Sequence, residues 1–116
     1  MKIISLKDII NDLSKNDIIK ILSLLSQLTN VYNDEDELKY MINQFQKSIK
    51  QLDSNINIFL IFIDNKISGI GTLIIEQKII HGFGKVGHIE DIVIDKEMIG
   101  KGIGKKFLEF LNFKAR

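Results

Sequence analysis

The stretch from Gly87 to Lys105 constrains the fold of this chain more than any other. His88–Asp95 is rich in isoleucine and valine over about the length of one strand, and Lys105–Phe113 spaces its apolar residues at helical intervals. Between them lie three alternating glycines, Gly100, Gly102 and Gly104. The first N–H groups of a helix lack internal partners and carry the positive end of the helix dipole, so such a corner binds anions. The stretch therefore predicts a strand, a diphosphate-binding loop and a helix, with added charge from Lys101, Lys105 and Lys106.

Two common phosphate-binding motifs do not fit this loop. A P-loop requires a glycine five residues before Gly104 and a serine or threonine at Lys106, and the sequence has neither. The dinucleotide pattern G-x-G-x-x-G fails at Gly100, because its third glycine would fall on Lys105. The pattern does occur at Gly82–Gly87, but a predicted strand follows it there instead of a helix, which excludes that motif.

The segment Ile99–Gly104, I-G-K-G-I-G, resembles the pyrophosphate loop of the GNAT acetyltransferase superfamily, whose usual pattern is [R/Q]-x-x-G-x-[G/A]. Upstream, E-Q-K-I-I-H at Glu76–His81 and G-H-I-E-D-I-V at Gly87–Val93 resemble, in order and spacing, the glucosamine 6-phosphate N-acetyltransferase family. Leu25–Thr29 is similar to the end of that family's first helix. The resemblance covers roughly residues 20 to 112, and Ile99 stands where the family usually has arginine.

The resemblance implies an α/β GNAT acyl-CoA N-acyltransferase fold, a mixed but mainly antiparallel sheet flanked by helices. Residues 1–116 are then expected to form a single GNAT domain, incomplete at its C-terminus after the helix that follows the loop. The implied reaction is direct acetyl transfer from acetyl-CoA, as co-substrate, to the amine of D-glucosamine 6-phosphate, in the route to UDP-N-acetylglucosamine. The family also implies a homodimer with the sugar site near the subunit interface.

Glu90 and Asp91 are the candidate catalytic residues. Carboxylates inside an apolar strand cost free energy unless they are paired or solvated, and in a regular strand these two would point to opposite faces. The alternative is a charge pair at an exposed strand end. In the resembling family these positions face the amino sugar and its amine, which must be neutral to attack a thioester. Either carboxylate is therefore expected to take the proton role.

The resemblance assigns the other candidate positions to two groups. The co-substrate is expected on the backbone of Ile92, Val93 and Ile94, as an added strand would pair, and on the loop residues Ile99, Gly100, Lys101, Gly102, Ile103 and Gly104. The sugar phosphate is expected at Thr29, Lys78, Ile79, Ile80 and His81, in addition to Glu90 and Asp91. An isolated lysine is more often only solvated and an isolated histidine structural, and His88 has no assigned role.

Composition narrows the function classes. A chain of 116 residues is at most one domain, and its net charge of +1 does not suggest bulk nucleic-acid binding or a polybasic membrane patch. With no cysteine there is no disulfide, thiolate ligand or cysteine nucleophile, and two histidines without a third ligand at metal spacing predict no metal site. The N-terminus has no signal-peptide core, so a cytoplasmic location is expected.

The remaining chain predicts the order β-α-α-β-β-β-α. A strand is expected within Lys2–Ile10, and a polar break with Asn16 as a candidate cap precedes a helix that runs through Thr29. Asp34 and Glu37 resemble a capping box that starts the second helix. The segments Asn57–Ile63, apolar on both faces and so central, and Ile67–Glu76 form a predicted hairpin, in which Gly69 and Gly71 indicate a bulge or close backbone approach; Gln77–Val86 is an excursion.

Three functional hypotheses stay open on the residues alone. The first is a working transferase for glucosamine 6-phosphate. The second is a truncated relative that binds coenzyme A without turnover, or that serves as a structural partner of a complete copy. The third is a GNAT enzyme acting on another amine. Turnover separates the first two hypotheses, and a panel of amine acceptors separates the first from the third.

Overall fold

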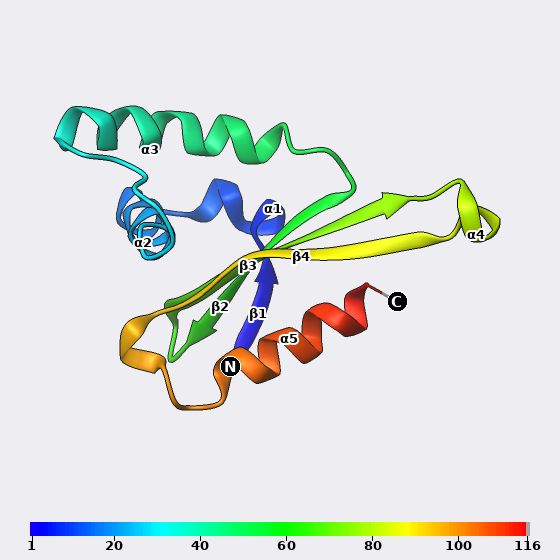
Figure 1. Cartoon of the computed structure of the whole chain (residues 1–116). Helices are drawn as coiled ribbons and strands as arrows, with labels where there is room; N and C mark the ends of the chain where they lie inside the picture. Colours follow the sequence, from blue (N-terminus) through cyan, green and yellow to red (C-terminus); the bar gives the residue numbers. More distant parts are fainter. Residues whose placement is uncertain (116) are drawn as a thin grey trace.

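The computed structural model describes residues 1–115 and, within them, every side chain except that of His81. Four antiparallel strands form one sheet in the order β1-β2-β3-β4 (Figure 1). Their bounds are β1 Lys2–Ser5, β2 Ile56–Ile63, β3 Lys66–Gln77 and β4 Lys85–Ile94. The order of the main elements and the antiparallel pairing agree with the predicted architecture.

Helices cover both faces of the sheet (Figure 1). On one face lie α1 (Leu6–Ile9), a 3₁₀ turn η1 (Ile10–Asp12), α2 (Lys15–Leu25) and α3 (Glu35–Lys50), and α5 (Ile103–Lys114) lies on the other. Each face has its own apolar core: the first includes Leu6, Ile21, Leu24, Leu60 and Val93, and the second includes Phe59, Ile61, Leu73, Phe107 and Leu111. Within the described residues, no helix is long and apolar enough to cross a membrane.

The N-terminal region differs from its prediction. β1 ends at Ser5, and the fully buried Leu6 begins α1, because an apolar pattern this short fits a strand and a helix equally well. The choice of Asn16 as the cap of α2 is wrong: the cap is Ser14, whose hydroxyl accepts from the Asp17 N–H at 3.1 Å while the Asp17 carboxylate accepts from the Ser14 N–H at 2.9 Å. This reciprocal capping box fixes the start of the helix two residues earlier than expected.

The predicted start of α3 is confirmed in part. The Asp34 side chain accepts from the Glu37 N–H at 2.8 Å, as a cap does. The Glu37 carboxylate instead accepts from the N–H of Asn33 at 2.9 Å, so the reciprocal bond reaches one residue further back. Both bonds satisfy donors near the helix start and leave α3 with an acidic first turn, which suits the helix dipole.

The hairpin of β2 and β3 is confirmed, as is the central position of β2. Asp64 and Asn65 have φ values of 51° and 63°, the left-handed pair that a two-residue turn between antiparallel strands requires. β2 lies between β1 and β3, and its residues Phe59, Leu60 and Ile61 are buried.

β3 and β4 continue beyond the helices as a two-stranded arm (Figure 1). The predicted excursion Gln77–Val86 is therefore shorter than expected, because pairing persists to Gln77 and Lys85. A short helix, α4 (Ile80–Phe83), forms the tip, and it exposes Ile80 and Phe83 to 64% and 67%. The other connection, between β4 and α5, contains the 3₁₀ turn η2 (Lys96–Met98).

Candidate active site

The two candidate catalytic carboxylates lie at a bulge in β4. Ile70 pairs with Val93 and Thr72 pairs with Glu90, so β4 has one more residue than β3 across this interval. Asp91 has a φ of 53°, in the left-handed region that aspartate tolerates better than most residues. The predicted irregularity at Gly71 is thus confirmed, with the extra residue on the opposite strand.

The bulge changes the alternation expected for a regular strand. Glu90, before it, shares its side of β4 with Val93, after it, which packs among α1, α2 and α3. Ile89 and Ile92 pack instead in the core under α5. The side chains of both Glu90 and Asp91 are exposed. The strand therefore carries two solvated carboxylates without burying either in an apolar core, which satisfies the requirement that charge in a strand be paired or solvated.

The segment predicted to bind the co-substrate by its backbone lies on an edge of the described sheet. β4 is the last strand in the order, so its outer edge faces no other strand among residues 1–115. The Ile94 carbonyl accepts from the Gln27 side-chain amide at 3.1 Å, and the next N–H, of Asp95, donates to the Ser68 carbonyl at 2.8 Å. The end of α2 is thereby fastened to the end of β4, beside the bulge.

The glycine loop has the geometry of an open anion-binding corner. Gly100 and Gly102 have φ values of 88° and 74°, and a Cβ built on either would meet no atom within 4 Å. Gly102 is the N-cap of α5 and offers no side-chain cap, so the first N–H groups of the helix remain available to a ligand. The three lysines of the loop and first turn, Lys101, Lys105 and Lys106, are exposed.

Two loop positions play different parts from the glycines. Ile103 is only 7% exposed and packs with Phe107 in the core under α5, so its backbone alone can meet a ligand. Ile99, which stands at the usual arginine position, is 68% exposed and projects from the turn that precedes the glycines. The loop itself is anchored from the core side by Ile103.

An ion pair ties α2 to the start of this loop. The Lys20 ammonium bonds to the Asp95 carboxylate, whose other oxygen accepts from the Glu97 N–H at 3.1 Å. The hydrogen bond from Lys20, followed by that from the Glu97 backbone, holds the pKa of Asp95 below its ordinary value. Lys20 and Asp95 also line a pocket of about 290 Å³ between the hairpin turn and the loop, which Lys66 and Lys101 line as well.

The predicted sugar-phosphate residues 78–81 lie at the arm, and three polar side chains meet at its base. The Lys78 ammonium is 2.9 Å from Glu76 Oε1, and His88 Nε2 is 2.7 Å from Glu76 Oε2. These bonds, that of Lys78 first, hold the pKa of Glu76 below its ordinary value. Ile79 is 81% exposed and Ile80 lies on α4; the side chain of the predicted His81 lies outside the described part.

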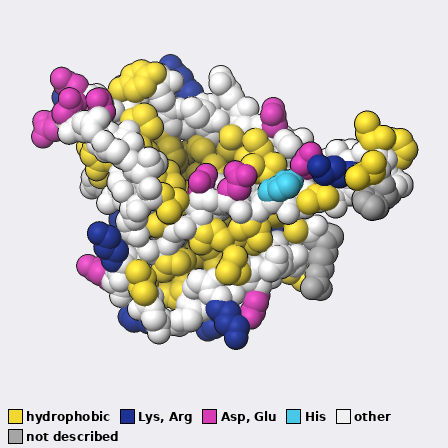
Figure 2. Space-filling model, viewed as in Figure 1, with side chains coloured by type: hydrophobic (Ala, Val, Ile, Leu, Met, Phe, Trp, Pro, Cys, Tyr) yellow, Lys and Arg dark blue, Asp and Glu magenta, His cyan; other side chains and the backbone are white. Residues whose placement is uncertain are grey.

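Figure 2 shows how these groups are arranged: acidic, histidine and lysine side chains follow one another along β4 toward the arm, with apolar surface on either side. Sequence reasoning gave no role to Glu76 or His88. A signal was present, because a glutamate and a histidine on paired strands form a cross-strand contact when the register is diagonal. The register itself could not be read before the arm was known to continue the sheet.

Thr29 is exposed and lies four residues beyond α2, which ends at Leu25. Its N–H donates to the Leu25 carbonyl at 3.3 Å, and no side-chain hydrogen bond joins it to β4 among the described residues. It is two residues from Gln27, which contacts β4 directly. Thr29 is therefore linked to the end of β4 through the neighbouring Gln27, which binds there.

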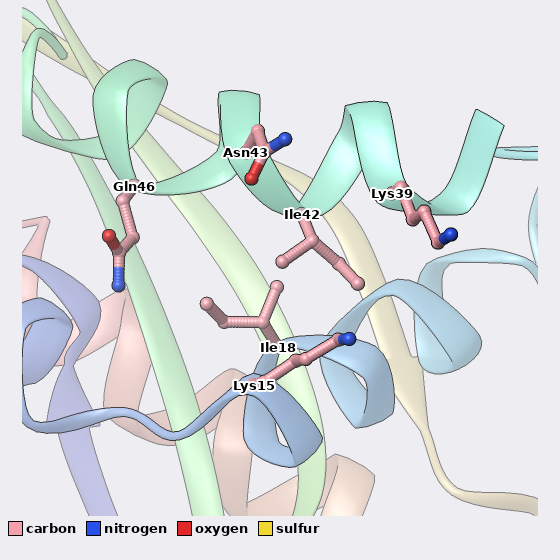
Figure 3. A pocket seen from close by; sticks show the side chains of 6 residues that line it. All are labelled: Lys15, Ile18, Lys39, Ile42, Asn43 and Gln46. Carbon is pink, nitrogen blue, oxygen red and sulfur yellow. The ribbon is translucent and has the colours of Figure 1, made fainter. Parts of the chain in front are cut away.

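A pocket of about 440 Å³ lies between α2 and α3 (Figure 3). Ile18 and Ile42 point toward each other across it, and lysine and amide side chains surround them: Lys15, Lys39, Asn43 and Gln46. None of these residues belongs to β4, the arm or the glycine loop, so this pocket is separate from the candidate site. No group of three metal-ligating side chains occurs among the described residues.

Comparison with known proteins gives one consistent result. The model of the acetyltransferase (GNAT) family matches residues 20–116. The glucosamine 6-phosphate N-acetyltransferase of Arabidopsis thaliana is 35% identical over 95 residues, which are 78% of this chain and 60% of that protein. Glucosamine 6-phosphate N-acetyltransferase 1 of Dictyostelium discoideum is 36% identical over 88 residues, 75% of this chain and 54% of that protein.

The solved structures agree. The crystal structure of glucosamine-6-phosphate N-acetyltransferase from Arabidopsis thaliana superposes with a TM-score of 0.65 at 31% identity, over 97% of this chain and 71% of that one. The chain spans little more than half the length of the curated relatives it matches.

Proposed function

The chain belongs to the GNAT acetyltransferase family, and on that premise we propose that it transfers an acetyl group from acetyl-CoA to the amine of D-glucosamine 6-phosphate. The products are coenzyme A and N-acetyl-D-glucosamine 6-phosphate, an intermediate on the route to UDP-N-acetylglucosamine. The observation that carries the proposal is the bulge of β4, which presents Glu90 and Asp91 to solvent on the strand that leads into the glycine loop. The substrate is inferred from the similarity to the relatives named above.

The residues present fit acetyl-CoA. Gly100 and Gly102 leave open the space that a Cβ would fill, the first turn of α5 has no side-chain cap, and Lys101 adds positive charge beside it. These groups would hold the diphosphate, and the edge of β4 at Ile92–Ile94 would hold the pantetheine arm. When bound, acetyl-CoA supplies the thioester-activated acetyl group.

The chain's own carboxylates would manage the proton of the acceptor amine. An ammonium group has no lone pair for attack on a carbonyl carbon, so the amine must lose a proton before or during the transfer. Glu90 or Asp91, directly or through a held water, accepts that proton, and the same negative charge orients the ammonium form as it arrives. The family resemblance implies direct transfer, and the lack of cysteine excludes an acyl-cysteine intermediate.

Free-thiol release from acetyl-CoA tests the proposal. The chain has no cysteine, so a thiol reagent detects only the coenzyme A that is released. We expect release that depends on glucosamine 6-phosphate and that falls by at least about a hundredfold in Glu90→Gln or Asp91→Asn, the low end of the usual effect of removing an acid–base group. Glu109→Gln, which neutralises an exposed carboxylate on α5, is the matched control and should keep full activity.

The same assay separates the alternatives. Absence of sugar-dependent release, together with acetyl-CoA binding by calorimetry, would overturn the enzyme proposal in favour of a chain that binds coenzyme A only. Faster release with glucosamine or a peptide amine than with glucosamine 6-phosphate would assign a different acceptor. Dimeric assembly is a further proposal from the family resemblance, and light scattering of the purified chain tests it. A cytoplasmic location stays a prediction from the sequence.

A further inference from the structure

Glu76, Lys78 and His88 form one hydrogen-bonded group at the base of the arm. One oxygen of the Glu76 carboxylate is 2.9 Å from the Lys78 ammonium, and the other is 2.7 Å from His88 Nε2. Only Lys78 has a proposed role so far, as a partner of the sugar phosphate. Glu76 directly, and His88 through Glu76, determine where the Lys78 ammonium lies.

The strand register places this group on the same face of the sheet as Glu90, one of the two candidate catalytic carboxylates. His88 is opposite Ile74 and Glu90 is opposite Thr72, so His88 and Glu90 point to the same face of β4, as do Glu76 and Ile74 on β3. Successive residues on one face of a strand are about 7 Å apart along it. A row of polar groups on this face therefore begins at Glu90 and continues through His88 to Glu76.

Glu76 brings the Lys78 ammonium back toward that row. The Lys78 backbone is beyond the end of β3, where its N–H donates to the Gly84 carbonyl at 2.8 Å. A free lysine there would place its long side chain anywhere around the arm, at a cost in rotamer entropy when a ligand fixes it. The contact with Glu76 places the ammonium on the same carboxylate that His88 contacts.

His88 in turn holds the Glu76 carboxylate. It contacts one carboxylate oxygen while Lys78 contacts the other, so both contacts together fix the orientation of the carboxylate. A phosphate ester then meets an ammonium group that is already placed.

We propose that Glu76 and His88 are positioning residues that hold Lys78 for the phosphate of the acceptor sugar. The inference rests on the function proposed above. The charged groups that face His88 among the described residues are Glu76 and Lys78 from the β3 side and Glu90 along β4.

If Glu76 and His88 only stabilised the fold, their loss would lower the thermal midpoint without changing affinity for the phosphate group in particular. The side chains of Lys78, Glu76 and His88 are 37%, 46% and 44% exposed. Ion pairs this exposed add little to folding, so their loss would hardly change the thermal midpoint. A positioning role, in contrast, changes affinity for the phosphate group and leaves the unphosphorylated sugar unaffected.

Calorimetric binding of N-acetylglucosamine 6-phosphate to the whole chain tests the proposal. This ligand has no titrating amine, and N-acetylglucosamine serves as the phosphate-free control. Glu76→Gln should weaken binding by about two- to fivefold, the range of an exposed charge contact. His88→Gln should weaken binding by a smaller factor, because it loosens the carboxylate without removing it. His88→Arg, which can still donate to Glu76, should keep the wild-type affinity.

Kinetics supply an independent readout where the chain turns over. Glu76→Gln should raise KM for glucosamine 6-phosphate and leave kcat within about twofold, because the change affects placement of the phosphate and not the proton transfer at Glu90 or Asp91. Equal affinities of wild type and Glu76→Gln for the phosphorylated sugar would overturn the proposal, as would failure of the wild type to bind that sugar. Binding with this pattern but without thiol release would support the positioning pair and reject the proposed acetyl transfer.

Discussion

Gly71→Ala tests whether the packing of α5 against the sheet sets the position of the glycine loop. A Cβ at this position would lie 2.6 and 2.8 Å from two atoms of the Phe107 ring and 3.3 Å from Ile92 Cγ1. Phe107 is fully buried, so its ring has no solvent-filled space to enter. Forcing a methyl group into a packed core costs about 1–3 kcal/mol. We expect the free energy of unfolding to fall by that amount.

The same clash should weaken ligand binding at a distance. Phe107 and Ile103 both lie on α5, and Ile103 follows Gly102, the last loop residue before the helix. If the ring moves away from Gly71, the helix start and its uncapped N–H groups move with it. Urea unfolding followed by circular dichroism measures the first effect, and calorimetric titration with coenzyme A measures the second.

Two further variants decide whether the ring is the cause. Phe107→Leu removes the clashing atoms, so adding Gly71→Ala to it should cost at least about 1 kcal/mol less than in the wild type. Gly104→Ala is the control on the same helix, since its Cβ would meet only Ile94 Cγ1 at 3.9 Å and alanine favours the helix by up to about 1 kcal/mol. A Gly71→Ala chain within about 0.5 kcal/mol of the wild type, or one destabilised equally in both backgrounds, would refute the reasoning.

Three other outcomes follow from the contacts described. Ser14→Ala should cost about 1 kcal/mol of unfolding free energy and Asn16→Ala less than about 0.5, and the reverse order by urea denaturation would contradict the capping box. Because the pKa of Asp95 is lowered, its pair with Lys20 stabilises the fold at pH values above the ordinary aspartate pKa, and this stabilisation is lost as the pH falls through the folded-state pKa. Between about pH 5 and 2 the wild type should therefore lose up to about 1 kcal/mol more unfolding free energy than Lys20→Met. Parallel pH profiles of the unfolding free energy would argue against the pair. Ile99→Arg, at an exposed position beside the glycines, should bind coenzyme A about three- to tenfold more tightly by calorimetry, and unchanged affinity would show that the loop makes no use of a cation there.

Elements defined by local chemistry were predictable from the sequence. Asp64 and Asn65 both accept left-handed backbone, so the hairpin follows from residues in immediate contact along the chain. The presence of α5 follows from glycines before an apolar helical pattern, but the helix begins at Ile103, two residues before the predicted Lys105, and includes Gly104. The cap of α2 was also available, because Ser14 and Asp17 have capping-box spacing, but the neighbouring Asn16 is an equally acceptable cap when residues are considered singly.

Features that depend on pairing between strands were not predictable to the residue. Gly71 indicated a bulge, yet only the register shows that the extra residue is Asp91 on the opposite strand. For the same reason the Glu76–His88 contact was missed, since it depends on how far the arm continues the sheet. The roles of the candidate residues remain predictions, and the structure adds their exposure, spacing and partners.

The extra residue at Asp91 reverses the alternation of side chains along β4 from that point on. Upstream of it, even-numbered positions such as His88 and Glu90 share one side of the sheet; downstream, the odd-numbered Val93 takes over that side. One strand can thus present charge to a ligand along its first half and apolar packing along its second half, on a single face. Deleting Asp91 would restore one frame throughout and exchange core for solvent on one side of the deletion. A change in the length of this strand would therefore reorient every side chain on one side of the change, whereas a substitution alters a single side chain.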